Sequence, residues 1–310
     1  MDAHLTWSDL ELMRELDVRG SVTAVAAAGR RTPSAVSQQL KTLQRRLRVP
    51  LIERTGRGIR LTDAGRALAE SANGVAVALA EADAAWQRFL GDVSGTVRLA
   101  SFFSASELLI PGLVERLSDH PDVRLDTFDE DVSQEDFPAL VADYDIVIAH
   151  RSDDTEPPPR EGVRVVSLFR EPLDVALPLT HTLAGRTAIE PHELLGEDWL
   201  VPPVGFPTER VLVALAARSG APVRVVRRTT HLPLIERLVA HGQGIALLPR
   251  YTTLAHANGG FALVPLTGLR AGRHVEALVR TDRAARRVVA WVLHALQDEA
   301  ASVLRSEAYR

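Results

Sequence analysis

Residues 32–47 read TPSAVSQQLKTLQRRL, and the organisation of the whole chain follows from this stretch. Threonine is a favourable N-cap and proline suits the first helical position, so Thr32-Pro33 predicts the start of a helix. Apolar side chains recur every three or four residues, at Ala35, Val36, Leu40, Leu43 and Leu47. The other face is left to Ser34, Ser37, Gln38 and Lys41, short or hydrogen-bonding side chains that suit the major groove of DNA. Taken alone, the stretch also fits an ordinary amphipathic surface helix.

The basic residues of the chain are concentrated around this helix. Residues 30–66 hold ten Arg or Lys and two acids, Glu53 and Asp63, so this segment carries a charge of +8. The net charge of the chain is −4, so the remaining residues carry −12. A basic block on an acidic body is typical of a protein that binds phosphate. A solvated charged face is the alternative. Because the block coincides with the candidate reading helix, we expect double-stranded DNA as a partner.

Segments on both sides complete a winged helix-turn-helix pattern. Helices are predicted at residues 5–16 and 22–28, and a short turn with Gly29 leads into the Thr32 helix. Beyond the helix, two short apolar segments flank the basic, glycine-rich tip of residues 54–58, which predicts a hairpin wing. Arg54 and Arg57 suit the minor groove or its phosphates, and a solubilising loop is the alternative.

Residues 62–90 predict one long helix that begins at the N-cap Thr62. Its apolar positions step by three and four residues, at Leu61, Ala64, Leu68, Ala72, Val75, Leu79, Ala82, Trp86 and Phe89. A long helix with a single apolar stripe most simply pairs with a second copy of itself. Packing against its own C-terminal domain is the alternative.

After a break at residues 91–95, strand and helix patterns alternate to the end of the chain. Strands are predicted at 96–101, 123–128, 145–149, 163–168, 173–177, 199–201, 223–227, 245–248 and 275–279, and helices at 106–117, 136–142, 209–217, 234–241 and 283–304. This alternation predicts mainly parallel α/β sheets with crossover helices. More than two hundred residues of it indicate two lobes, with a ligand cleft at the carboxyl ends of the strands.

Composition and missing motifs narrow the function classes. The chain has no cysteine, its acidic N-terminus has no apolar signal-peptide core, and no run approaches eighteen apolar residues. We therefore expect a soluble, cytoplasmic protein without a membrane partner. A nucleophile elbow, a P-loop and an HExxH motif are missing, so no enzyme activity, metal or cofactor is expected. His150 and His231 are expected near the cleft but structural, and Asp129-Glu130-Asp131 is expected to be a solvated strand end.

These residues resemble the LysR-type transcriptional regulators. The N-terminal resemblance rests on Gly20–Ala26, Ser34–Leu40, Leu43, Arg54 and Leu61–Gly65, and covers about residues 5–66. A weaker C-terminal resemblance rests on His120-Pro121, Asp145–Ile148, His181–Ala184 and Leu238–Pro249. Gln38 stands where many members have Arg or Lys, and Pro33-Ser34 where many have Gln-Pro.

The resemblance implies an α+β multidomain protein. It has a winged helix-turn-helix at 1–61, a linker and dimerisation helix at 62–91, and a two-lobed α/β effector domain similar to periplasmic binding proteins at 92–310. Lobe 1 takes about 92–164 and 268–310, and lobe 2 about 165–267. The implied assembly is a homodimer or homotetramer that switches transcription, through DNA bend and RNA polymerase contact, when a small molecule of unknown identity enters the cleft.

The resemblance also implies site residues. DNA contacts fall on Pro33, Ser34, Ser37, Gln38 and the wing arginine, beside Thr32, Lys41, Arg54 and Arg57 from the pattern itself. Effector contacts fall on Ser101, Phe102, Phe103, Ser104, Ala149, Pro203, Val204, Gly205, Thr230 and His231. A carboxylate would suit Ser101 with free backbone N–H groups at a helix start, and the two phenylalanines indicate an apolar or aromatic part of the ligand.

Two other classes stay open at this point. One is an architectural DNA-binding protein with a ligand-free cleft. The other is a cytoplasmic α/β protein that binds a small molecule or acts as an enzyme, with N-terminal helices that serve only oligomerisation. The charge of +8 on residues 30–66 argues against this second class, because a protein that does not bind nucleic acid needs no such basic segment.

Overall fold

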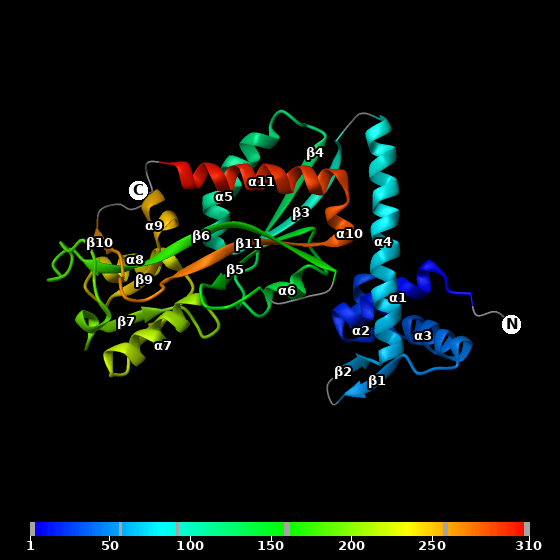
Figure 1. The fold of residues 1–310 in the computed structure, drawn as a ribbon, viewed down its shortest axis with the longest axis horizontal. Helices are drawn as coiled ribbons and strands as arrows, with labels where there is room; N and C mark the ends of the chain where they lie inside the picture. Colours follow the sequence, from blue (N-terminus) through cyan, green and yellow to red (C-terminus); the bar gives the residue numbers. More distant parts are fainter. Residues whose placement is uncertain (1–3, 56–57, 91–92, 158–161, 257–259, 307–310) are drawn as a thin grey trace.

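The computed structural model describes residues 4–55, 58–90, 93–157, 162–256 and 260–306. Figure 1 shows a small N-terminal domain around the lower part of an upright helix, α4, and a larger domain built on a long sheet beside it. Among the described residues, no helix combines the length and the apolar character needed to cross a membrane.

The small domain is a winged helix-turn-helix. It consists of α1 (Trp7–Arg19), α2 (Val22–Ala28), α3 (Pro33–Leu47), β1 (Ile52–Thr55) and β2 (Gly58–Leu61). α1 starts at Thr6, whose side chain accepts from the Asp9 amide while the Asp9 carboxylate accepts from the Thr6 amide. Met13, Leu16, Val36 and Leu43 meet in one core.

α4 (Asp63–Leu90) is a single helix of 28 residues, as the heptad pattern predicts. Its start presses against the domain core, since a Cβ on Gly65 would lie 2.2 Å from the carbonyl oxygen of Leu51. The two sides of α4 differ. Ala69, Ala72, Ala76 and Ala84 are buried, whereas the larger Val75, Leu79, Trp86 and Phe89 are exposed.

Lobe 1 of the large domain has a sheet with helices on its faces (Figure 1). Its elements are β3 (Gly95–Ser101), α5 (Phe103–Leu117), β4 (Val123–Asp129), α6 (Phe137–Leu140), β5 (Ile146–Ser152), the returning β11 (Gly272–Arg280), α10 (Thr281–Ala284) and α11 (Arg287–Arg305). β3 is parallel to both β4 and β5. One apolar core joins these strands with α5 and α11.

Lobe 2 lies beyond the long strand β6 (Val163–Pro178). It comprises η1 (Pro191–Leu194), β7 (Asp198–Val201), α7 (Pro207–Ser219), β8 (Arg224–Arg228), α8 (Leu232–Ala240), β9 (Ala246–Pro249), α9 (Arg250–His256) and β10 (Phe261–Val264). β7 and β8 form a parallel pair, while β9 and β10 both join β6. The expected lobe boundaries near 164 and 268 fall close to the starts of β6 and β11, and they remain predictions.

The sheet corrects the expectation of mainly parallel strands. Its order is β10-β6-β11-β5-β3-β4, with β9 also paired to β6. β11 is antiparallel to both β5 and β6, because the chain crosses to lobe 2 along β6 and returns along β11. The two strands expected at 163–168 and 173–177 are one strand. Arg170 and Glu171 resemble a break in the sequence, but both side chains have ion-pair partners, Asp153 and Arg273.

Candidate functional sites

The exposed face of α3 carries the residues predicted to contact DNA. Val36, Leu40 and Leu43 are buried in the domain core, so the opposite face is turned to solvent. Ser34, Gln38 and Lys41 are exposed and Ser37 is half-buried, at the spacing i, i+4, i+7 and i+3 that places side chains on one helix face. Thr32 and Pro33 open the helix, and Thr32 Oγ1 accepts from the amide of Ala35 at 3.2 Å.

Side chains at the edges of this face fix the orientation of α3. Gln39 Nε2 donates to Ser8 Oγ at 3.0 Å, and the Leu51 amide donates to Gln44 Oε1 at 2.8 Å. Arg46 forms an ion pair with Asp9 at the start of α1. Burial alone would raise the pKa of Asp9, but the Thr6 hydrogen bonds and Arg46 hold that pKa below its ordinary value. α3 is therefore bonded to both neighbouring segments.

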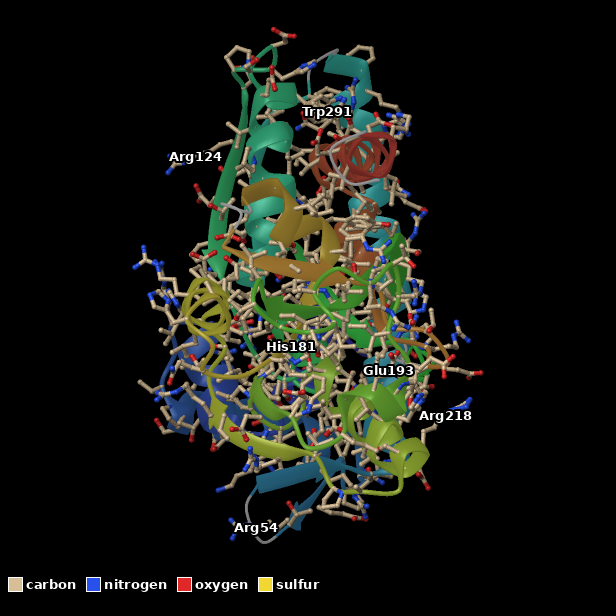
Figure 2. All side chains as sticks on the ribbon, turned by 90° about the vertical axis from the view of Figure 1, so that its left-hand side faces the viewer. Arg54, Arg124, His181, Glu193, Arg218 and Trp291 are labelled. Carbon is tan, nitrogen blue, oxygen red and sulfur yellow. The ribbon has the colours of Figure 1, made fainter. Side chains whose placement is uncertain are left out.

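The wing hairpin places a second basic element on the same domain. β1 and β2 are antiparallel, with Arg54 opposite Ile59 and Glu53 opposite Arg60. Arg60 forms an exposed ion pair with Glu53, in which its Nη2 lies 3.1 Å from Glu53 Oε2. Figure 2 shows Arg54 at the lower end of the molecule, on the wing. Arg57 lies outside the described residues.

A cavity of about 200 Å³ lies between the two lobes. Residues from lobe 1, lobe 2 and the crossing strands line it: Phe102, Phe103, Ser104, Glu107, Asp131, His150, Leu173, Pro202, Phe206, Pro207, Thr208, Thr230, His231, Leu232, Pro233, Leu247, Pro249 and Arg273. An engineered cavity of roughly 150 Å³ is enough to hold benzene, so this space fits one compact small molecule.

A buried ion pair stands in the wall of this cavity. Arg273 in β11 places Nε 3.0 Å and Nη2 2.6 Å from Oε2 of Glu171 in β6, and Nη2 also donates to Ser104 Oγ at 2.8 Å. Glu171 is fully buried, and its Oε1 accepts from the Thr252 amide. The guanidinium of Arg273 also lies over the Phe102 ring. The positive charge of Arg273 is thus balanced inside the wall.

His150 in β5 is the unusual polar group of the cavity. It is 3% exposed, and neither ring nitrogen has a hydrogen-bond partner within the described part of the chain. The rings of Phe102, Phe137 and Phe206 surround it, with centroids 5.0, 4.8 and 5.4 Å away. Burial, with the nearby charge of Arg273, lowers the pKa of His150 to about 3. The imidazole is neutral, with one donor and one acceptor nitrogen unused.

The cavity brings together half of the predicted effector residues. Phe102, Phe103, Ser104, Thr230 and His231 line it. Ser101, Ala149, Pro203, Val204 and Gly205 are not part of the lining. Ser101 is buried in β3 and its hydroxyl donates to the Phe102 carbonyl, and Ala149 is buried in β5 beside His150. Pro203 and Val204 are exposed, and the amide of Gly205 donates to Glu209 Oε2.

Sequence reasoning missed the charged members of the lining. Arg273 is in β11 but precedes the strand expected at 275–279, and its partner Glu171 lies between the strands expected at 163–168 and 173–177. Asp131 belongs to the acid run expected to be solvated, yet it lines the cavity. Burial raises the pKa of Asp131, against the opposing effects of Thr230 and Arg273. The one sequence signal for Glu171 is its place between two apolar runs, and no local pattern marks Arg273.

Comparison with known proteins matches both parts of the chain. The model of the bacterial regulatory helix-turn-helix proteins of the lysR family matches residues 7–66, and that of the LysR substrate binding domain matches residues 90–301. The HTH-type transcriptional regulator MetR of Escherichia coli K12 is 27% identical over 264 residues, 84% of this chain and 79% of MetR.

Two solved structures share the fold. A full-length OxyR variant from Pseudomonas aeruginosa has a TM-score of 0.66 at 19% identity, with 99% of this chain and 97% of OxyR covered. Full-length CbnR complexed with its target DNA has a TM-score of 0.54 at 19% identity, with 96% of this chain and all of CbnR (100%) covered.

Proposed function

Because this chain belongs to the LysR family of DNA-binding transcriptional regulators with an effector-binding domain, we propose which residues carry each role. The α3 face of Ser34, Ser37, Gln38 and Lys41 reads the operator, and the wing grips the flanking backbone through Arg54. A small molecule in the cavity between the lobes switches transcription. Members of this family are regulators rather than typical enzymes.

The observation that carries the DNA proposal is the division of α3 into two faces. The buried face fixes the helix to the domain core, and the remaining face offers hydrogen-bonding side chains followed by arginines in the last turn. Gln38 can form a bidentate pair with adenine, whereas Lys41 suits a phosphate. The first contact would specify sequence and the second would mainly add affinity.

The exposed side of α4 supports a homodimer. Val75, Leu79, Trp86 and Phe89 form an apolar stripe on a helix whose alanine side is already covered. Trp86 and Phe89 stack with centroids 5.4 Å apart, so the stripe ends in a large aromatic surface. A second copy of α4 would bury it and set the spacing of two reading helices. We infer a homodimer, with association into a homotetramer and contact with RNA polymerase as further steps in the cytoplasm.

The salt dependence of DNA binding tests this assignment. Fluorescence anisotropy with the full chain and a labelled duplex should show affinity that falls steeply with salt, because Lys and Arg displace counterions. Lys41→Ala should weaken binding to every duplex and reduce the salt slope by about one. Glu70→Ala, an exposed change on α4, is the matched control and should leave the slope unchanged. A wild-type slope near zero would contradict the proposal.

A further inference from the structure

Three helices direct their N-termini at the cavity between the lobes. α5, α7 and α8 each contribute the N-cap and the first two helical residues to its lining: Phe102, Phe103 and Ser104; Phe206, Pro207 and Thr208; His231, Leu232 and Pro233. The first amides of a helix have no partner inside the helix, and the helix dipole adds partial positive charge there. The three ends therefore converge on one small volume.

Two of these ends lack the usual side-chain cap. The N-caps of α5 and α7 are Phe102 and Phe206, and neither side chain accepts a hydrogen bond from its helix. In α8, by contrast, His231 Nδ1 accepts from the Leu234 amide at 3.2 Å. α5 and α7 span 15 and 13 residues, so each has a developed dipole. A carboxylate of the ligand would supply an acceptor for the amides of Phe103 and Ser104 in α5 and for the amide of Thr208 in α7, where Pro207 has no N–H.

The lining nevertheless contains acids that disfavour a simple anion. Asp131 and Glu107 bring two carboxylates to the cavity. Arg273 offsets Asp131 only in part, because Glu171 lies within hydrogen-bond distance of the same guanidinium. Asp131 is the better placed of the two acids, since it is half-buried and its side chain hydrogen-bonds with Thr230. A cationic group beside Asp131 would compensate a carboxylate that burial now penalises.

His150 is independent evidence that a ligand belongs here. Its two unpartnered nitrogens are buried in an apolar shell, and a buried polar group without a hydrogen-bond partner destabilises the folded state. The neighbouring wall is apolar, with Phe102, Phe206, Leu173 and Leu247. A ligand that presents a hydrogen-bonding group at this wall would remove the penalty.

We propose that the ligand of this cavity is a zwitterion with an ammonium and a carboxylate on one compact skeleton, as in an α-amino acid. This inference rests on the proposed function, since it names the chemical class of the effector. The carboxylate binds the first turns of α5 and α7, the ammonium binds Asp131, and the remainder contacts Phe102, Phe206 and His150. A ligand with one charge of either sign satisfies half of these groups and is repelled by the others.

Matched compounds test the proposal. The full chain is titrated with the common α-amino acids and, for each skeleton, with its deaminated and decarboxylated analogues, for example L-phenylalanine, 3-phenylpropionate and 2-phenylethylamine. Thermal melts find binders and calorimetry gives the dissociation constants. We expect at least one amino acid to bind at least tenfold more tightly than both of its single-charge analogues. A single-charge analogue that binds equally well or better, or a panel without any binder, overturns the proposal.

Variants of Asp131 test whether this residue binds the ammonium group of the ligand. Asp131→Asn should weaken binding of the amino acid at least tenfold and leave or improve binding of the deaminated analogue. Asp119→Asn, an exposed acid on lobe 1, is the matched control and should change neither. An equal loss for both ligands in Asp131→Asn overturns the ammonium assignment. Wild-type DNA binding is measured separately: its presence without an amino-acid binder rejects the ligand class alone, and its absence rejects the proposed function.

Discussion

Nη1 of Arg14 in α1 lies 2.9 Å from Oδ2 of Asp282 in α10, so an ion pair joins the DNA-binding domain to the effector domain. The side chains are 9% and 17% exposed, and Arg280 and Glu15 extend the pair into a network. Arg19 adds a second link to Asp143 at 2.9 Å. Figure 1 shows α10 beside the linker helix α4, where the two domains meet. Two ion pairs therefore connect lobe 1 directly to α1.

A double-mutant cycle on Arg14→Gln and Asp282→Asn measures this link. Because the pair is mostly buried and shares a network, we expect a coupling energy in the free energy of unfolding of about 1–3 kcal/mol. The cycle Arg60→Gln with Glu53→Gln, on the exposed wing pair, is the control and should give less than about 1 kcal/mol. Additive effects at Arg14 and Asp282 would show that the domains are not coupled through them.

We expect the winged helix-turn-helix domain to lose stability in acid because of Asp9. Its pKa is held below 3.8 in the folded state, so its contribution to stability is present above that pH and is lost as the pH falls through the lower, folded value. Asp9→Asn should lower the free energy of unfolding by about 1 kcal/mol at pH 7, because the cap and the contact with Arg46 are weakened. Urea unfolding of both proteins at pH 7 and at pH 3 checks this. The wild type should lose more of its free energy of unfolding at pH 3 than Asp9→Asn does, and an equal loss in the two proteins would contradict the prediction.

The variant His150→Leu tests whether the buried imidazole destabilises the folded protein or is needed for its core. The folded state keeps His150 neutral down to a pH of about 3, whereas the unfolded chain takes up a proton below 6.5, so acid destabilises the wild type. At pH 5 this amounts to about 2 kcal/mol. The variant should be the more stable protein, and increasingly so as the pH falls below 6.5, while its affinity for the ligand drops. A variant less stable than the wild type at pH 5 would assign His150 to the core.

Glu171→Gln should be among the most destabilising single changes in the effector domain. It leaves Arg273 buried without its counter-charge, and breaking a buried pair costs about 3–5 kcal/mol. Chemical unfolding of the full chain, followed by tryptophan fluorescence, measures the loss. Glu53→Gln on the wing serves as the exposed comparison. A loss at Glu171 as small as that at Glu53 would mean that water screens the Arg273 pair.

The helices of the DNA-binding domain could be predicted from the sequence because their signals are local. The capping of Thr32, the three- and four-residue spacing of Val36, Leu40 and Leu43, and the long stripe of α4 each lie within a few turns of chain. The sequence predicts a helix from Ser106, whereas α5 begins at Phe103, because a phenylalanine gives no capping signal. Tertiary contacts decide that helix end.

The cavity could be predicted only in part for the same reason. Residues at loop starts, such as Phe102 and Thr230, follow from the rule that ligands bind at strand ends. Arg273 and Glu171 are 102 positions apart and meet through the antiparallel pairing of β6 and β11, which no local pattern specifies. His150 was recognised as a residue near the cleft, but its unpartnered nitrogens depend on three phenylalanines from separate segments.

The most direct test of the account is selection of DNA sites from a random duplex library by the full chain and by Gln38→Ala. The wild type should enrich an interrupted dyad with half-sites on one face of the DNA double helix, since two copies of α3 read it. Gln38→Ala should enrich the same dyad with preference relaxed by about 1–3 kcal/mol at one base pair of each half-site. Enrichment of no common site, or identical preference in both proteins, would contradict the claim that this face of α3 reads the operator.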